Sequence, residues 1–318
     1  MVAKTLERVV RQPWIWSAAG SALLWLLTAG ISGRGLFGSL IANAAIASFL
    51  VVVSLGQMFT VTTGEGGIDL SIPYVMTLSA FISVAVMDGS NYHFVYALLL
   101  AICLGSVVGL VNALLILGLR IPPIIATMSM GFVMNSAAIL YSNKLTSFSP
   151  SPLLTTLTQG RLAGIPIILI CVVCISILVA FILRRTVFGR SIFAVGQNRV
   201  AARMAGVRTT RIVSVAYLIS GSMAGLGGFL LAGRDGGAFM QMGNPYLLES
   251  VGAVVIGGTL ISGGKSTVVG TLFGALFLVL VVTLMEITRF PTGIQEVIQG
   301  IVILGVLTMA NQDSRITA

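Results

Sequence analysis

The chain alternates between long apolar runs and short polar segments. Runs of roughly 17 to 25 apolar residues have the length that an α-helix needs to cross a hydrocarbon core about 30 Å thick. The pattern therefore predicts an all-α, polytopic integral membrane protein with about ten transmembrane helices. These are expected at residues 14–30, 41–63, 72–87, 93–117, 122–142, 163–183, 213–233, 247–262, 266–288 and 293–310.

Glycine-rich segments interrupt this pattern. The sequence GEGGIDLS separates the second and third spans, and Gly-Gly pairs at 257–258 and 263–264 bound the short eighth span. Irregular backbone within a membrane must be buried in protein or line a water-filled cavity, so broken or re-entrant helices are expected. Residues 106–117 also resemble residues 267–280, and the two segments run in opposite predicted directions. This indicates a possible inverted repeat, as in many transporters, with chance similarity of apolar segments as the alternative.

Charge predicts orientation. The chain is 57% hydrophobic and 8% charged, with a net charge of +9. If the N-terminus is cytoplasmic, thirteen of the eighteen Lys and Arg residues fall on the cytoplasmic side. Such an excess is typical of cytoplasmic loops, so the positive charge is read as a topology signal and not as nucleic-acid binding. Both termini are expected in the cytoplasm.

The same topology divides the chain into parts. We expect a cytoplasmic N-terminus at 1–13, one transmembrane domain at 14–311 and a cytoplasmic C-terminus at 312–318. The segment 143–162 is rich in Ser and Thr and contains Pro150 and Pro152, which predicts an exposed loop on the outer side. The largest cytoplasmic loop spans 184–212.

That cytoplasmic loop contains a predicted short helix. Between residues 184 and 211 lie seven arginines and no Asp or Glu. Asn198 is a suitable N-cap and Gly206 a suitable C′ glycine for a helix of about two turns. Val200, Ala201 and Met204 would share one face, and Arg199 and Arg203 another. Because so short a helix is unstable alone, it needs a surface on which to dock.

Enzymatic chemistry is not predicted, and neither is a metal or cofactor site. His93 is the single histidine, and Cys103, Cys171 and Cys174 lie in apolar runs. A phosphate-binding loop near Lys265 would need its first glycine at position 259, where the chain has Thr259. If transport here uses ATP, another chain must bind the nucleotide.

Polar residues and glycines within the apolar region are candidates for a translocation path, since ionisable groups in membranes usually face a cavity or a partner. Alternatives stay open: a helix-capping role for Asp69, a subunit contact for Glu249, and interhelical hydrogen bonds for the amides. The candidates are Gln57, Gly66, Gly67, Asp69, Asn112, Asn135, Glu249, Gly257 and Gly258.

Three blocks of sequence resemble the permease subunits of bacterial ABC importers for monosaccharides. These form the ribose and autoinducer-2 group, related to branched-chain amino-acid permeases. The blocks are GQMFTVTTGEGGIDLSIPYVMTLSA from Gly56, TVFGRSIFAVGQNRVAARMAGV from Thr186 and ESVGAVVIGGTLISGGKSTVVGTLFGALFL from Glu249. The chain departs from the family pattern at Glu65 and Pro73, and residues 246–250 keep one acid where relatives commonly have two.

The resemblance implies a division of labour among several chains. Two permease chains, identical or paralogous, would form the pore in a bacterial inner membrane. ABC ATPase subunits would dock from the cytoplasm, and a periplasmic or lipid-anchored binding protein would deliver the solute. The short helix would be the coupling helix, with contacts at Asn198, Arg199, Ala202, Arg203, Met204 and Gly206.

The resulting prediction is the permease subunit of an ATP-driven importer of a monosaccharide or similar small polyhydroxylated solute, working by alternating access. An ion-coupled secondary transporter and a non-transporting membrane scaffold or receptor are the alternatives. The solute itself stays open.

Overall fold

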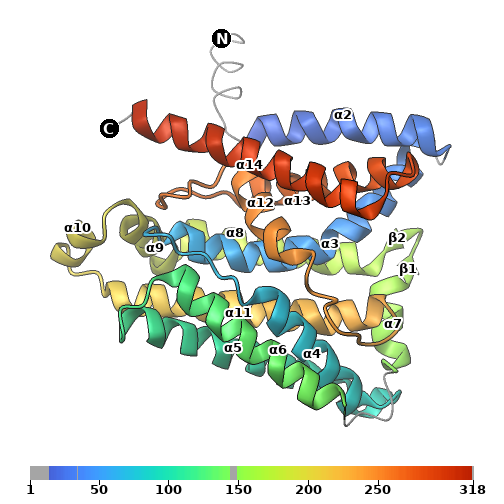
Figure 1. Ribbon diagram of the computed structural model, residues 1–318, viewed down its shortest axis with the longest axis horizontal. Helices are drawn as coiled ribbons and strands as arrows, with labels where there is room; N and C mark the ends of the chain where they lie inside the picture. Colours follow the sequence, from blue (N-terminus) through green and yellow to red (C-terminus); the bar gives the residue numbers. More distant parts are fainter. Residues whose placement is uncertain (1–13, 34, 144–148, 317–318) are drawn as a thin grey trace.

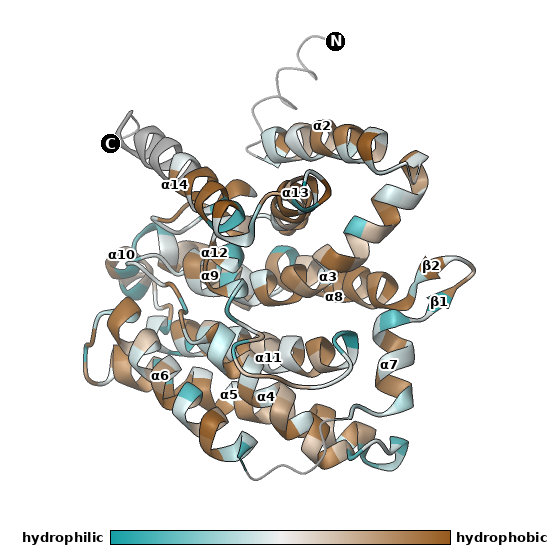
Figure 2. Cartoon of the chain, turned by 45° about the vertical axis from the view of Figure 1, so that its right-hand side comes forward, coloured by the Kyte–Doolittle hydropathy of each residue, from teal (hydrophilic) through white to brown (hydrophobic). Residues whose placement is uncertain are grey.

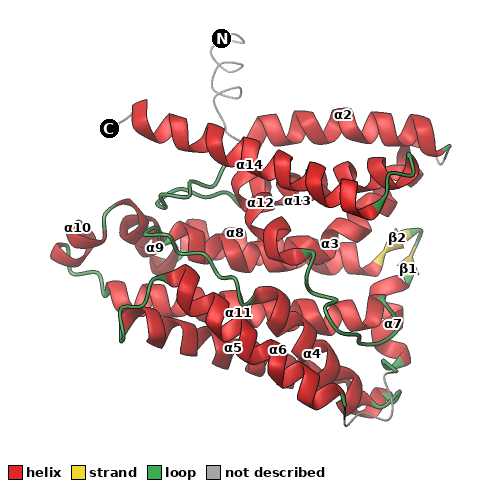
Figure 3. Ribbon diagram, in the orientation of Figure 1, coloured by secondary structure: helices red, strands yellow, loops and turns green. Residues whose placement is uncertain are grey.

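The computed structural model describes residues 14–33, 35–143 and 149–316, and it consists almost entirely of helices that run side by side (Figures 1 and 3). The predicted N-terminus at 1–13 and the last two residues of the predicted C-terminus at 312–318 lie outside the described residues. In chain order the elements are α2 (Trp14–Ser32), α3 (Gly35–Thr62), α4 (Ile72–Met87), η1 (Asn91–His93), α5 (Phe94–Leu117), α6 (Pro123–Ser142), α7 (Pro152–Gln159), β1 (Arg161–Leu162), β2 (Ile165–Pro166), α8 (Ile167–Arg185), α9 (Val187–Gln197), α10 (Arg199–Met204), α11 (Thr209–Arg234), α12 (Tyr246–Ile256), α13 (Val268–Ile287) and α14 (Thr292–Ile316).

Each of the ten expected spans contains a helix, so the predicted polytopic helical fold is confirmed. Seven helical segments are long and apolar enough to cross a membrane: α2, α3, α5 with η1, α6, α8, α11 and α13. The other three, α4, α12 and the apolar part of α14, are shorter. Helix α12, which lies in the eighth expected span, ends at Ile256, six residues earlier than expected. Residues 257–267 form an irregular segment.

The elements alternate between two ends of the molecule. Figure 1 shows α9, α10 and the turn between α5 and α6 at one end, and α7 with the β1–β2 hairpin at the other. Helix α2 begins, and α14 ends, toward the end that carries α10. This arrangement agrees with the alternating spans of the predicted topology, while the side of the membrane on which each end lies stays a prediction.

The outer surface of the bundle is apolar over much of its length (Figure 2). Large side chains such as Leu99, Phe132, Leu140, Ile177 and Phe181 are each more than half exposed. A water-soluble protein rarely exposes contiguous apolar surface of this extent. The surface is therefore suited to lipid.

Helix α11 lies at the centre of the bundle, and most of its residues after Ser220 are buried. It packs against α3, α4 and α5, and its glycines permit close backbone contact. A Cβ added at Gly105 of α5 would lie 1.9 Å from the carbonyl oxygen of Gly221, and one added at Gly221 would lie 2.0 Å from that of Gly105. Small residues allow helix backbones to approach in this way within membranes.

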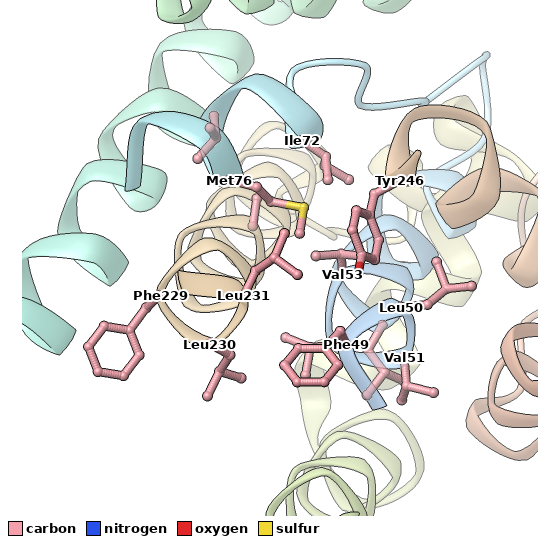
Figure 4. Packing of buried hydrophobic residues seen from close by; sticks show 14 of the residues in the cluster. Phe49, Leu50, Val51, Val53, Ile72, Met76, Phe229, Leu230, Leu231 and Tyr246 are labelled. Atoms are coloured by element: carbon pink, nitrogen blue, oxygen red, sulfur yellow. The ribbon is translucent and has the colours of Figure 1, made fainter. Parts of the chain in front are cut away.

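The apolar core surrounds this crossing. Figure 4 shows Leu50 of α3, Met76 of α4, Leu231 of α11 and Tyr246 of α12 converging on one cluster. Polar contacts also join the helices: Thr283 donates to Asn43 at 2.7 Å, and the hydroxyls of Ser106 and Ser222 lie 2.7 Å apart.

Residues 152–159 form a helix, α7, and Arg161–Leu162 a short strand, so the prediction of an exposed loop is wrong for segment 151–162. The Ser151 hydroxyl accepts from the Leu154 amide at 3.3 Å, and Pro152 occupies the first turn, so the pair begins helix α7. Leu154 and Ser151 are fully buried, and Leu154 packs on Gly233 of α11. Residues 144–148 lie outside the described residues.

The α5–α11 contact leads to a stability prediction. Gly105→Val should lower the free energy of unfolding by about 3 kcal/mol, because the new side chain must push the two backbones apart. Thermal unfolding of the purified protein in detergent measures the effect. Gly30→Val is the matched control, since a Cβ there meets no atom within 4 Å. Equal melting temperatures for both variants would contradict the close packing.

Candidate functional site

The segment between α8 and α11 contains two helices, of which sequence analysis predicted only the second. Helix α9 begins where the Thr186 hydroxyl accepts from the Gly189 amide at 3.1 Å, and it buries Ile192 and Val195. A cap followed by buried apolar residues at helical spacing was the signal that could have identified α9. A single residue, Asn198, joins α9 to α10.

Helix α10 has the predicted boundaries. The Asn198 side chain accepts from the Ala201 amide at 2.9 Å, which caps the N-terminus. Gly206 follows the last turn with a φ of 84°, and the Val207 amide reaches the Ala202 carbonyl at 3.0 Å. This is the Schellman arrangement that ends many helices. The six-residue helix therefore has specific ends despite its length.

The faces of α10 differ in what they contact. Ala202 is buried and packs with Val195, Val213 and Tyr217. Val200 is 73% exposed and Met204 is 85% exposed, and Arg203 is also exposed. The helix thus presents an apolar and basic surface away from the bundle.

The two arginines predicted to act together occupy different environments. The Arg199 side chain is only 20% exposed, and its Nη1 lies 2.5 Å from the Glu65 carboxylate in the first glycine-rich break. Glu65 is the residue that departs from the family pattern, and it adopts a left-handed φ of 51°. The ion pair therefore ties α10 to the α3–α4 break, whereas Arg203 forms no ion pair with the described residues.

Three segments that are distant in sequence meet backbone to backbone behind α10. We name Gly64, Gly196, Gly263 and Gly264 the glycine junction. The Gly264 amide donates to the Thr62 carbonyl at 3.0 Å. A Cβ at Gly196 would lie 1.9 Å from that same carbonyl oxygen, and one at Gly263 would lie 2.5 Å from the Gly64 nitrogen. The C-terminal end of α9 thus packs against both the α3–α4 break and the irregular segment after α12.

Three of the predicted path residues form a buried polar network. Asp69 is 1% exposed; its carboxylate accepts from the Ser71 amide at 3.0 Å, the Ser71 hydroxyl at 2.6 Å and the Ser220 hydroxyl at 2.7 Å. Asn112 donates to the Ser71 hydroxyl at 2.9 Å. The Gln57 side-chain amide pairs with the Asp69 backbone at 3.2 Å. The network joins α3, α5 and α11 to the start of α4, which agrees with the alternative roles in capping and interhelical bonding.

The other predicted path residues lie apart from this network. Asn135 is half-buried on α6. Gly67 packs on the Thr60 carbonyl, and Gly257 packs on Gly270 of α13. Gly66 and Gly258 adopt φ values of 72° and 85°, which glycine tolerates without strain. The glycines therefore shape the two breaks.

Glu249 lines a separate cavity of about 590 Å³ among α3, α11, α12 and α13. We name it the outer cavity. Leu231 and Arg234 at the C-terminal end of α11 line it, whereas α10 lies at the N-terminal end of α11. The two ends of α11 are about 39 Å apart, because the helix has 26 residues that rise 1.5 Å each. The Arg234 guanidinium stacks 5.2 Å from the Phe49 ring centre and lies 3.4 Å from the Tyr246 hydroxyl. Gln299 donates to Glu249 at 2.6 Å. Sequence analysis did not identify Arg234 or Tyr246 as part of a site.

Electrostatics in this outer cavity are mixed. Asp235 follows the last residue of α11, and its carboxylate lies 3.5 Å from Arg234. Burial raises the pKa of Asp235, and the neighbouring guanidinium offsets part of that rise. Within the described ranges, no group of three or more His, Cys, Asp or Glu side chains could hold a metal ion.

Comparisons with known proteins agree on one family. The family described as "Branched-chain amino acid transport system / permease component" matches residues 39–307. The chain is 32% identical to the autoinducer 2 import system permease protein LsrC of Enterobacter sp. (strain 638), over 89% of this chain and 85% of the relative. It is 33% identical to the ribose import permease protein RbsC of Bacillus subtilis (strain 168), over 80% of this chain and 78% of the relative. No solved structure matches.

The buried network supplies a second prediction. Asp69→Ala should lower the free energy of unfolding by about 3 kcal/mol, because three donors lose their acceptor in a buried site. Thermal unfolding in detergent reports the loss. Ser136→Ala is the control, since its hydroxyl binds only its own helix in an exposed position. If Asp69→Ala melts at the wild-type temperature, the network does not hold these helices together.

Proposed function

The chain belongs to the branched-chain amino acid transport system / permease component family, and from this membership we propose that it forms the pore of an ATP-driven importer for a small polyhydroxylated solute. Family membership makes it a permease component of ABC importers and not an enzyme. The finer proposal is a monosaccharide or similar solute, delivered by a periplasmic or lipid-anchored binding protein. Ribose and autoinducer 2 appear in the names of two relatives, and they support this solute class.

One observation carries the proposal: α10 is a short, well-capped helix that projects from the bundle and is tied to both breaks. A pore that is driven by another chain needs a rigid contact that moves with it. The Glu65–Arg199 ion pair and the glycine junction supply this rigidity, because they leave α9 and α10 little freedom to move alone. We infer that ABC ATPase subunits dock on α10 from the cytoplasm.

The expected contact residues then divide into two groups. Asn198 and Gly206 define the ends of α10, Ala202 anchors it, and Arg199 holds it to the break. Arg203 and Met204 of the predicted set, together with Val200, are exposed and would contact the ATPase. Methionine and arginine are enriched at protein interfaces, and arginine is common among the residues that dominate binding energy.

The outer cavity is suited to the arrival of solute at the other end. It combines hydrogen-bonding groups from Arg234, Asp235, Tyr246 and Glu249 with the ring of Phe239. Sugars present hydroxyls and apolar faces together, so such a lining is favourable for them. We place the entry of the path here, with Glu249 as its one predicted member, and a second permease chain completing the pore.

The whole topology follows the same proposal. We place the protein in the bacterial inner membrane, with both termini and α10 in the cytoplasm. This orientation puts Arg120, Lys265 and the arginines of 184–211 on the inside.

Transport distinguishes the proposal from the ion-coupled and scaffold alternatives. Proteoliposomes that contain the permease, its cognate ATPase subunit and its binding protein should accumulate a labelled pentose or hexose only when ATP is supplied to the ATPase side. The control is the same preparation with a non-hydrolysable ATP analogue. Uptake on a proton or sodium gradient by the permease alone would contradict the proposal, as would no uptake of any sugar.

The docking surface gives a further prediction. Val200→Asp and Met204→Asp should each reduce co-purification of the ATPase by about tenfold, because each places a charge in an apolar contact. Leu162→Asp is the matched control: Leu162 is 64% exposed in the β1–β2 hairpin at the opposite end. Membrane insertion should be equal in all three. Undiminished ATPase binding by both α10 variants would exclude this surface.

A further inference from the structure

A second cavity, of about 400 Å³, lies beside α10 at the end opposite the outer cavity. We name it the inner cavity. Four segments enclose it: the α3–α4 break, the α5–α6 turn, α10 and the first two turns of α11. Its polar lining residues are Thr63, Glu65, Arg120, Arg199, Arg203, Thr209, Thr210 and Tyr217.

The lining of the inner cavity is predominantly cationic. Arg120, Arg199 and Arg203 line it together with a single carboxylate, that of Glu65, which is already paired with Arg199. The Nε of Arg199 is buried without a hydrogen-bond partner in the described chain. An excess of two positive charges therefore surrounds a space that the described residues do not fill.

The N-terminus of α11 adds to this positive potential. Thr209 and Thr210 of its first turn line the inner cavity, and no side chain caps this end of the helix. The first amides of a helix lack intrahelical acceptors, and the aligned peptide dipoles favour an anion there. The N-terminus of α11, a helix of 26 residues, is therefore suited to bind phosphate.

Tyr217 supplies an independent observation. Its side chain is 1% exposed and lines the inner cavity, yet its hydroxyl has no hydrogen-bond partner anywhere in the described chain. Leaving a buried hydroxyl unpaired costs about 1–3 kcal/mol. Thr210, Val213 and Tyr217 recur at helical spacing and line the same cavity, so the hydroxyl belongs to the same face of α11 as the uncapped end.

We propose that the inner cavity binds a phosphate group, either free, on a small phosphorylated metabolite, or on a lipid headgroup. Free phosphate or a phosphomonoester, as a dianion, would balance both excess charges, and the phosphodiester of a lipid headgroup would balance one; guanidinium groups bind the oxygens of either strongly. It would join Arg203 of α10 to Arg120 of the α5–α6 turn, next to the glycine junction. An occupant would thus brace α10 against the bundle. This site goes beyond the proposed transport function and does not depend on it.

Isothermal titration calorimetry with inorganic phosphate, on the purified full-length chain in phospholipid-free detergent at constant ionic strength, tests the site. Arg120→Gln and Arg203→Gln should each weaken binding about tenfold, because each removes a charged hydrogen-bond donor. Tyr217→Phe should weaken it severalfold without changing charge. Arg208→Gln is the matched control: it removes one arginine beside the cavity, but Arg208 is not part of its lining.

Two outcomes would overturn the proposal: no phosphate binding by the wild-type chain, or equal binding by the wild type and all three cavity variants. Size-exclusion profiles identify any variant that does not fold, and Tyr217→Phe, the mildest change, keeps the test informative.

Nanodiscs distinguish a lipid headgroup from a free phosphate as the source of the bound group. If phosphatidylglycerol discs abolish phosphate binding and phosphatidylcholine discs do not, the site takes a lipid headgroup; binding in both discs supports a free phosphate. Because no ATPase or sugar is present, failure here would leave the transport proposal intact.

Discussion

Backbone amides and carbonyls that leave a helix inside a membrane must find partners within the protein, and this constraint shapes the whole structure. The chain meets it by packing one irregular segment against another. The Thr62 carbonyl, left free where α3 ends, accepts from Gly264 in the segment after α12. Glycine is required there, since the backbones of Gly64, Gly196 and Gly263 leave no room for a Cβ. The position of α10 follows, because Gly196 is the penultimate residue of α9.

A second consequence is that polar groups are used to fix helices in place. Asp69 sits where α4 begins, and its carboxylate reaches Ser220 on α11, 151 residues away in sequence. Ser71 extends the contact to Asn112 on α5. The same residues that are candidates for a solute path by their chemistry thus hold three helices together. The cavities lie instead at the two ends of α11, where charged side chains gather.

Much of the fold could be predicted from sequence because it is local. Apolar runs identified all ten spans, and Asn198 and Gly206 marked the ends of α10 because caps act within a few residues. Contacts between distant segments could not be predicted in this way. The Glu65–Arg199 pair is an example: Glu65 lies in one break and Arg199 in a different loop, and only the folded glycine junction brings them together. Helices α7 and α9 were missed because their short apolar patterns are weak beside those of the membrane spans.

Helix α11 contains no proline, and it runs without interruption from the inner cavity to Arg234 at the outer cavity. Its glycines face neighbouring backbones, where they permit close approach and leave the hydrogen-bonded ladder intact. An uninterrupted hydrogen-bonded helix of this kind would resist compression along its axis. One continuous helix thus connects the inner cavity with the outer cavity, so the axial stiffness of α11 bears on how the two cavities are coupled.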